Sequence, residues 1–129
     1  MTVTENEECF PKRIRLLRRS EFQRVYKNGR RARADHFTVF FDHNQLPYSR
    51  FGITVSRKLG SAVTRNRLRR IFREAIRKSR TSAVNGLDFV FNPHAEAVKI
   101  QSTELLKELA AVYFRLKEKN HAARPADHH

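Results

Sequence analysis

Hydrophobic residues recur with the period of an α-helix in the middle of the chain. Between residues 63 and 80, an apolar residue falls at i, i+3, i+4, i+7 and i+8, which is the stripe of an amphipathic helix. We therefore expect a helix from about Val63 to Arg80 that packs this stripe against the rest of the protein. The stripe consists of Leu68, Ile71, Phe72, Ala75 and Ile76.

Two segments before this helix alternate between apolar and polar residues, as strands with one buried face do. They span residues 36–42 and 50–56, and a third strand is predicted over residues 87–91. Pro93 is expected to end that third strand, because proline cannot donate a hydrogen bond to a neighbouring strand. The predicted inward positions of the first two strands are Phe37, Val39, Phe41, Phe51, Ile53 and Val55.

A helix is also predicted at each end of this central part. Ser20 and Gln23 form a capping-box pattern ahead of an apolar run, which Asn28-Gly29 ends. A last helix is expected from Ser102, its N-cap, to about Lys117. Its inward residues are Leu105, Leu109, Val112 and Leu116.

The elements follow the order helix, strand, strand, helix, strand, helix, and one further strand before the central helix is left open (α-β-β-(β)-α-β-α). The predicted class is α+β, an α/β sandwich with a small central sheet packed by helices. The chain of 129 residues fits one domain. We expect this domain over residues 10–118, with a flexible tail at 1–9 and a disordered tail at 119–129.

The charge of the chain narrows the possible partners. The formal net charge is +14, and 20 of the 27 Lys and Arg residues lie in segments 12–33 and 57–80. Such a balance favours a nucleic acid partner over an anionic membrane. No apolar run is long enough to span a membrane, and the acidic first residues exclude a signal peptide. The single Cys9 excludes an internal disulfide, so a cytoplasmic location is expected by elimination.

The predicted central helix carries most of this charge in a regular pattern. Arginine recurs every fourth residue beside the apolar stripe, and Glu74 is the only acid nearby. Adjacent guanidinium groups repel one another, so we interpret this face as a contact for RNA or DNA rather than a solvated surface. The repeat consists of Arg65, Arg69, Arg73 and Arg77, with Asn66 and Arg70 in the same arc.

Three aromatic residues are candidates for stacking on nucleic acid bases. Phe40 falls on the polar face of its strand, and Tyr26 ends the first helix next to a run of arginines. Aromatic rings bordered by cations are typical of single-strand binding surfaces. Phe22 lies one turn before Tyr26, and for this residue core packing is an equally good interpretation.

Catalysis by the protein itself is a weaker hypothesis. His36 and His43 are the best pair for general acid–base cleavage of RNA, but an uninterrupted strand would point them to opposite faces. No paired carboxylates, glycine-rich phosphate loop or nucleophile motif is present. We therefore expect no catalytic residue and no metal site in the protein. An RNA- or DNA-binding module of another kind remains an alternative at this point.

Several of these segments together resemble the protein subunit of bacterial ribonuclease P. Its signature is a Lys, a short spacer and then Ala-Val-x-Arg-Asn-x-x-Lys/Arg-Arg-x-x-Arg-Glu. Further matches are the segments 15–22, 26–29 and 51–58, and the resemblance covers residues 10–117. Here the signature consists of Lys58, Ala62-Val63, Arg65-Asn66, Arg69-Arg70 and Arg73-Glu74.

The resemblance implies a left-handed β-α-β crossover and a protein that is not itself the catalyst. The catalytic RNA subunit, with Mg²⁺ bound mainly by that RNA and the substrate, would cleave the 5′ leader from precursor tRNA. The partners implied are this RNA and precursor tRNA, with no membrane and no obligate protein partner.

The resemblance also assigns residues to the two RNA ligands. His94 stands where the family usually has Arg or Lys, and Arg69 where Lys is common. The leader cleft maps onto Phe22, Tyr26, Phe40, Arg57 and Lys58, and the signature helix contacts RNA through Arg65, Asn66, Arg67, Arg69, Arg70 and Arg73.

Overall fold

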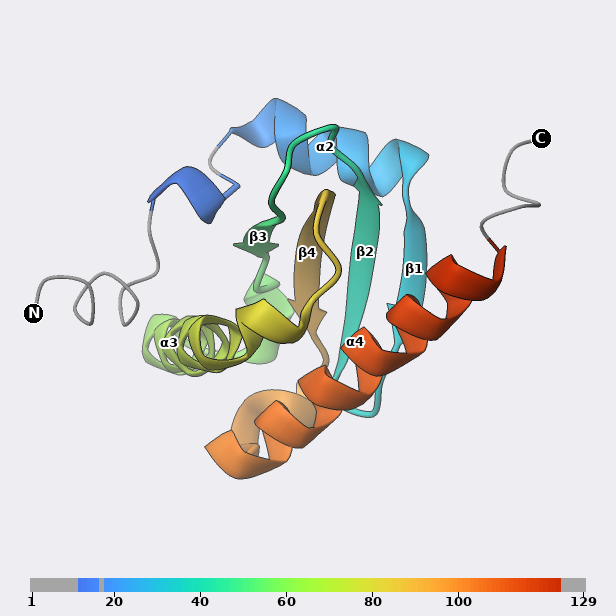
Figure 1. Cartoon of the computed structure of the whole chain (residues 1–129). Helices are drawn as coiled ribbons and strands as arrows, with labels where there is room; N and C mark the ends of the chain where they lie inside the picture. Colours follow the sequence, from blue (N-terminus) through green and yellow to red (C-terminus); the bar gives the residue numbers. More distant parts are fainter. Residues whose placement is uncertain (1–11, 17, 124–129) are drawn as a thin grey trace, which may run out of the picture.

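The computed structural model of the protein describes residues 12–16 and 18–123, with side chains up to residue 118. In Figure 1, a four-stranded sheet lies between α2 at the top and α3 and α4 at the bottom. The order along the chain is α-β-β-β-α-β-α, which confirms the predicted α+β class; the third strand before α3 is β1, which precedes the two predicted strands rather than following them. The elements are α2 (Arg19–Asn28), β1 (Arg30–Arg33), β2 (Phe37–His43), β3 (Arg50–Ile53), α3 (Ala62–Ser79), β4 (Leu87–Pro93) and α4 (Ser102–Ala123), with short 3₁₀ turns between them.

The strands are arranged in the order β1-β2-β4-β3. β2 runs antiparallel to both β1 and β4, whereas β3 and β4 are parallel neighbours. Parallel neighbours need a crossover connection, and α3 provides it. The central strand β4 therefore holds the two halves of the sheet together.

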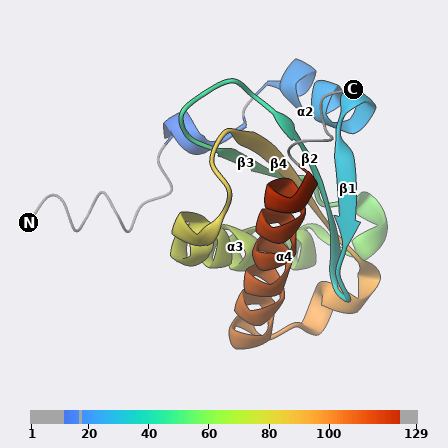
Figure 2. The ribbon, with the colours of Figure 1, turned by 45° about the vertical axis from the view of Figure 1, so that its right-hand side comes forward.

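One face of the sheet forms the main core. Phe37 and Val39 of β2 are fully buried with Phe89 and Phe91 of β4, as alternation predicts. The stripe of α3 and the inward positions predicted for α4 pack on this face, and Tyr113 joins them. In Figure 2, α4 stands in front of the sheet and α3 lies beside it. The amphipathic interpretation of both helices is confirmed.

The opposite face carries α2. Leu16 and Val25 are buried there against Val90, and Phe22, Tyr26 and Phe40 pack partly buried around them. This second cluster is small, so apolar contacts alone fix α2 only weakly.

Ionic hydrogen bonds centred on Asp88 complete the attachment of α2. Asp88 is fully buried in β4, and its carboxylate accepts from Arg50 Nε and Nη2 at 2.9 and 2.8 Å and from the Arg24 guanidinium. Arg24 also donates to Asp42 at 3.2 Å, and Arg50 donates to Glu21 at 3.0 Å. The hydrogen bonds to Asp88 raise the pKa of Arg50, so it stays charged. The network joins α2 to three strands.

Both edges of the sheet are protected from pairing with other chains. β1 has the sequence Arg-Arg-Ala-Arg, and its arginines are exposed. Charged side chains on an edge strand disfavour aggregation. At the other edge, the Leu16 N–H donates to the Phe51 carbonyl at 2.9 Å, so the segment before α2 covers β3.

Several predicted boundaries are wrong. α2 begins at Arg19, and its capping box uses Glu21, which accepts from the Arg18 N–H at 3.1 Å, rather than Ser20 and Gln23. α3, in contrast, begins at Ala62, one residue from the predicted start, and its N-cap is Ser61, whose hydroxyl accepts from the Thr64 N–H.

The strand and tail predictions also differ from the structure. β3 ends at Ile53, three residues before the predicted end, while β4 continues to Pro93. α4 includes Ser102 and extends to Ala123, so residues 119–123 of the expected disordered tail are helical. The tail at 1–9 and residues 124–129 lie outside the described residues. A search of the described part of the chain finds no helix with the length and apolar character of a membrane span.

Replacing Asp88 with Asn should destabilise the fold. The variant leaves Arg24 and Arg50 without their shared anion, and breaking a buried ion pair costs about 3 kcal/mol or more. The free energy of unfolding, measured by urea denaturation, should fall by about this amount. Asp35→Asn is the matched control, because Asp35 is exposed, and it should change stability by less than about 0.5 kcal/mol. Equal stability of the two variants would contradict the assignment.

Candidate RNA-binding surface

Two of the predicted stacking residues meet on the α2 face of the sheet. The rings of Tyr26 and Phe40 lie edge to face, with centroids 4.9 Å apart. The Tyr26 hydroxyl donates to Asn92 Oδ1 at 2.9 Å, which fixes the ring against β4. Both rings are half-buried, so each leaves part of its surface to a ligand. The structure thus joins residues 14 positions apart into one aromatic platform, consisting of Tyr26 and Phe40.

Phe22 lies one turn before Tyr26 on α2 and lines a pocket between α2, β3 and α3. Its ring lies over Gly52, where an added Cβ would come within 2.6 Å of Phe22 Cζ. Phe22 is therefore compatible with both core packing and contact with a ligand, because it packs on the second cluster and also faces the pocket. The pocket has a volume of ≈ 120 Å³ and is lined by Arg15, Leu16, Phe22, Phe51, Gly52, Ile53, Arg69 and Arg73.

The turn before α3 presents two of the predicted leader contacts. Arg57 and Lys58 lie in the 3₁₀ turn Arg57–Leu59 and are exposed. Gly60 follows with φ +139°, a conformation that favours glycine, and its carbonyl accepts from Arg65 Nε at 3.2 Å. This places Arg65 at the beginning of α3 against the turn.

The arginines of α3 differ in what they contact. Arg70 and Arg73 are exposed. Arg69 donates to Asn66 Oδ1 at 2.8 Å, so these two residues are ordered together on the outer face. Seven residues of α3 are Arg or Lys, and its only acid is Glu74. The predicted arc is therefore an open cationic surface.

Arg67 is directed elsewhere. Its guanidinium donates to the Val98 carbonyl at 2.6 Å and to the Ile100 carbonyl at 3.5 Å. These carbonyls belong to the segment between β4 and α4, on the other side of α3 from the pocket. The side chain thus fastens α3 to the chain before α4, a structural role that helical periodicity alone does not predict.

The surface includes residues that the sequence did not single out. Asn92 holds Tyr26, and Gly52 makes room for Phe22. His94 Nε2 is 2.7 Å from Thr38 Oγ1, next to Phe40 on β2, so the residue that replaces the family's base lies near the platform. Strand alternation could have placed Asn92 and Gly52 on this face, because Phe40 pairs with Val90.

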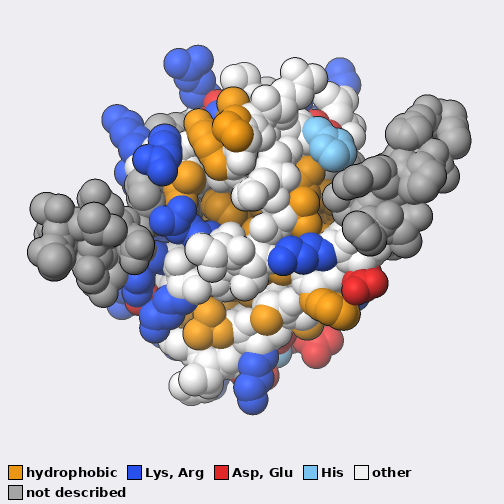
Figure 3. Space-filling model, viewed as in Figure 1, with side chains coloured by type: hydrophobic (Ala, Val, Ile, Leu, Met, Phe, Trp, Pro, Cys, Tyr) orange, Lys and Arg blue, Asp and Glu red, His pale blue; other side chains and the backbone are white. Residues whose placement is uncertain are grey.

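The described histidines do not form a pair for acid–base chemistry. His36 precedes β2 and His43 ends it, so their side chains lie at opposite ends of a seven-residue strand. His36 contacts Glu108, and His94 contacts Thr38. What the structure brings together is an aromatic and cationic binding surface. Figure 3 shows Lys and Arg gathered at the left, over α3 and the start of α2.

Comparisons with known proteins relate this chain to one family. The family model of ribonuclease P matches residues 10–117. The ribonuclease P protein component of Thermotoga petrophila is 43% identical over 86 residues, which cover 67% of this chain and 74% of that protein. The component of Bacillus cereus is 33% identical over 105 residues, covering 81% and 91% of the two chains.

Solved structures show the same fold. The ribonuclease P protein of Thermotoga maritima matches with a TM-score of 0.73 and 31% identity, over 78% of this chain and 96% of that one. A Staphylococcus aureus ribonuclease P protein mutant matches with a TM-score of 0.73 and 25% identity, over 92% and 97%. The chain therefore belongs to the ribonuclease P protein family, the RNA-binding, non-catalytic subunit of the endoribonuclease that processes tRNA 5′ ends.

Proposed function

We propose that this protein binds the catalytic RNA subunit through α3 and the 5′ leader of precursor tRNA on its α2 face. In this way it assists endonucleolytic removal of the leader. The observation that carries the proposal is the adjacency of two different surfaces. Phe22 faces the same pocket as Arg69 and Arg73, so the aromatic side of the molecule and the cationic helix share a border.

The aromatic platform suits an extended single strand. Bases of any identity stack on aromatic rings, while cations follow the phosphates. Tyr26 and Phe40 offer ring surface beside the arginines of β1, because Arg31 is the register partner of Phe40. On this model, Arg57 and Lys58 hold the leader where it leaves the pocket toward α3.

The outer face of α3 suits a folded RNA. Arg70 and Arg73 present exposed guanidinium groups that can bind phosphates in a bidentate manner. Asn66 and Arg69 add a hydrogen-bonded pair next to them. Arg65 supports the turn at the start of the helix, and Arg67 contributes charge while it holds α3 in position.

The chemistry of cleavage is assigned to the RNA subunit. Mg²⁺, bound mainly by that RNA and by the substrate, would supply the metal-ion chemistry of phosphodiester hydrolysis. The protein then acts by positioning the substrate and by offsetting phosphate repulsion between substrate and RNA subunit. A protein with this role is needed most at low Mg²⁺.

A cleavage assay with three arms tests the proposal. Precursor tRNA is incubated at low Mg²⁺ with the protein alone, the catalytic RNA alone, or both. Cleavage should occur only, or much faster, with both present, because neither part alone holds the substrate. Cleavage by the protein alone would make it an autonomous nuclease, and no gain on adding it to the RNA would also contradict the proposal.

Phe40→Ala should weaken binding of precursor tRNA to the holoenzyme by about 5- to 100-fold, since a stacked base contributes about 1–3 kcal/mol. Binding of mature tRNA, which has no leader, should be nearly unchanged. Affinities are measured for both ligands with the assembled holoenzyme. Phe114→Ala is the control, because Phe114 is an exposed aromatic on α4. An equal loss for both tRNAs would place Phe40 outside the leader site.

Arg70→Ala should weaken assembly with the catalytic RNA and make it less sensitive to salt. Removing one phosphate contact lowers the slope of log K against log salt concentration by about 1. Binding is titrated at several salt concentrations. Lys107→Ala removes one exposed charge from α4 and should leave the slope nearly intact. Identical slopes for the two variants would show that α3 does not make the phosphate contacts.

A further inference from the structure

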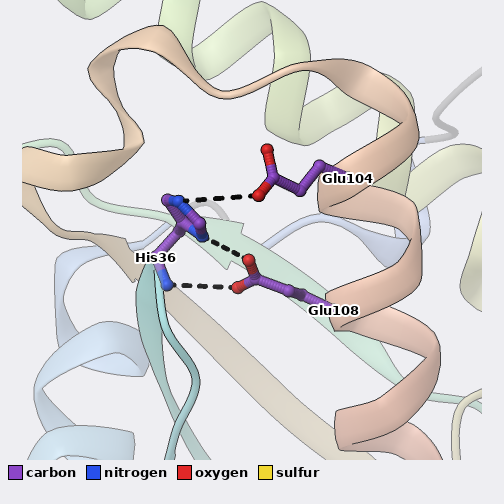
Figure 4. A group of neighbouring side chains, drawn as sticks. All are labelled: His36, Glu104 and Glu108. Carbon is purple, nitrogen blue, oxygen red and sulfur yellow. Dashed lines mark hydrogen bonds and ion pairs between the residues drawn. The ribbon is translucent and has the colours of Figure 1, made fainter.

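Three potential metal ligands meet on the side of the sheet opposite the aromatic platform. His36 lies in the turn between β1 and β2, and Glu104 and Glu108 lie one turn apart on α4 (Figure 4). Each offers one ligand atom, and these atoms all lie within 4.8 Å of one another. Among the described residues, no other group of three His, Cys, Asp or Glu side chains comes this close.

Glu108 is held in place by the backbone. Its Oε1 accepts from the His36 N–H at 3.1 Å, while Oε2 contacts the His36 ring at Nδ1. Glu104 Oε2 is 4.0 Å from His36 Nε2. The side chains of His36 and Glu108 are 19% and 15% exposed, whereas Glu104 is 53% exposed. Two ligands are therefore nearly fixed, and the third can adjust.

The two carboxylates of this group have no Lys or Arg as an ion-pair partner among the described residues, although the chain is strongly basic. In the described part of the protein, Glu104 and Glu108 form ion pairs only with His36. Like charges at i and i+4 on a helix are unfavourable, so the two neighbouring carboxylates leave negative charge that a cation would offset. The acids that pair with Arg or Lys are Glu21, Asp42, Glu74 and Asp88.

We infer that His36, Glu104 and Glu108 bind a divalent transition-metal ion of the Zn²⁺ type. One imidazole nitrogen and two carboxylate oxygens form a three-ligand set, and water completes the coordination on the exposed side. Zn²⁺ lies about 2.0–2.2 Å from such atoms, which places tetrahedral ligands about 3.4 Å apart. Rotation of Glu104 closes the present gap. Imidazole disfavours Mg²⁺, which prefers oxygen ligands alone.

The bound ion would join the β1–β2 turn to the first turns of α4. Farther along α4, Arg115 Nη2 also donates to the Arg33 carbonyl of β1 at 3.2 Å. The ion thus acts as a clamp on the edge of the sheet, and it does not touch the aromatic platform or α3. The inference is independent of the proposed function, because neither RNA ligand is assigned to this side.

Zn²⁺ titration of the full chain tests the site. His121, His128 and His129 are replaced by Ala in all proteins, so that these C-terminal histidines do not compete. Calorimetry should give one Zn²⁺ per chain, and the thermal midpoint should rise with Zn²⁺ but not with equal Mg²⁺. Co²⁺ should give the visible absorption of a low-symmetry site with nitrogen and oxygen ligands.

Glu104→Gln is the decisive variant, because the side chain is half exposed and its loss leaves the His36–Glu108 contact intact. Its Zn²⁺ affinity should fall at least tenfold, whereas Glu96→Gln, at an exposed acid of the segment before α4, should bind as the parent does. Wild-type affinity in Glu104→Gln, or no Zn²⁺ binding by the parent, would overturn the inference.

Discussion

A single buried carboxylate, Asp88, determines where α2 lies on the sheet. Its two oxygens accept hydrogen bonds from Arg24 of α2, Arg50 of β3 and Asn44 of the loop after β2. A buried charge is tolerated only when it is paired and fully hydrogen-bonded. The cost of burying it is met only when α2 and the strands adopt this one arrangement. Because Phe22 and Tyr26 are carried by α2, the geometry of the proposed leader site depends on a residue that has no place in that site.

Strand register determines which side chains lie on each of the two faces of the sheet. In β2, Phe37 and Val39 point to the core, while the residues between them face α2. A shift of one residue would bury Thr38 and expose the core side chains, so the large core fixes the register. Phe40 is thereby presented on the open face beside Tyr26. The stability of one face thus supplies the binding geometry of the other.

Sequence patterns predict those parts of the fold in which the order of apolar and polar residues within one segment shows which of its faces is buried. The stripe of α3 and the alternation of β2 are such patterns, and both are confirmed. β1 shows no alternation of apolar and polar residues, because three of its four residues are arginine, and periodicity therefore does not locate this edge strand. The Asp88 network and the contacts of His36 with α4 were not predicted, since the hydrogen bonds in them join residues 18 to 72 positions apart. Contacts of that range depend on tertiary packing, which composition and period do not encode.

The basic residues show most clearly how structure changes the interpretation of charge. Net charge alone treats every arginine as a possible RNA contact. Yet Arg24 and Arg50 are bound to Asp88, Arg67 is held by backbone carbonyls, and Arg77 pairs with Glu74, whose pKa that contact lowers. Exposed arginines lie on α3 (Arg70 and Arg73), in the turn before it (Arg57) and along β1. One residue type therefore serves two purposes: arginines with an internal acceptor hold the fold together, and the exposed arginines are available for the phosphate contacts proposed above.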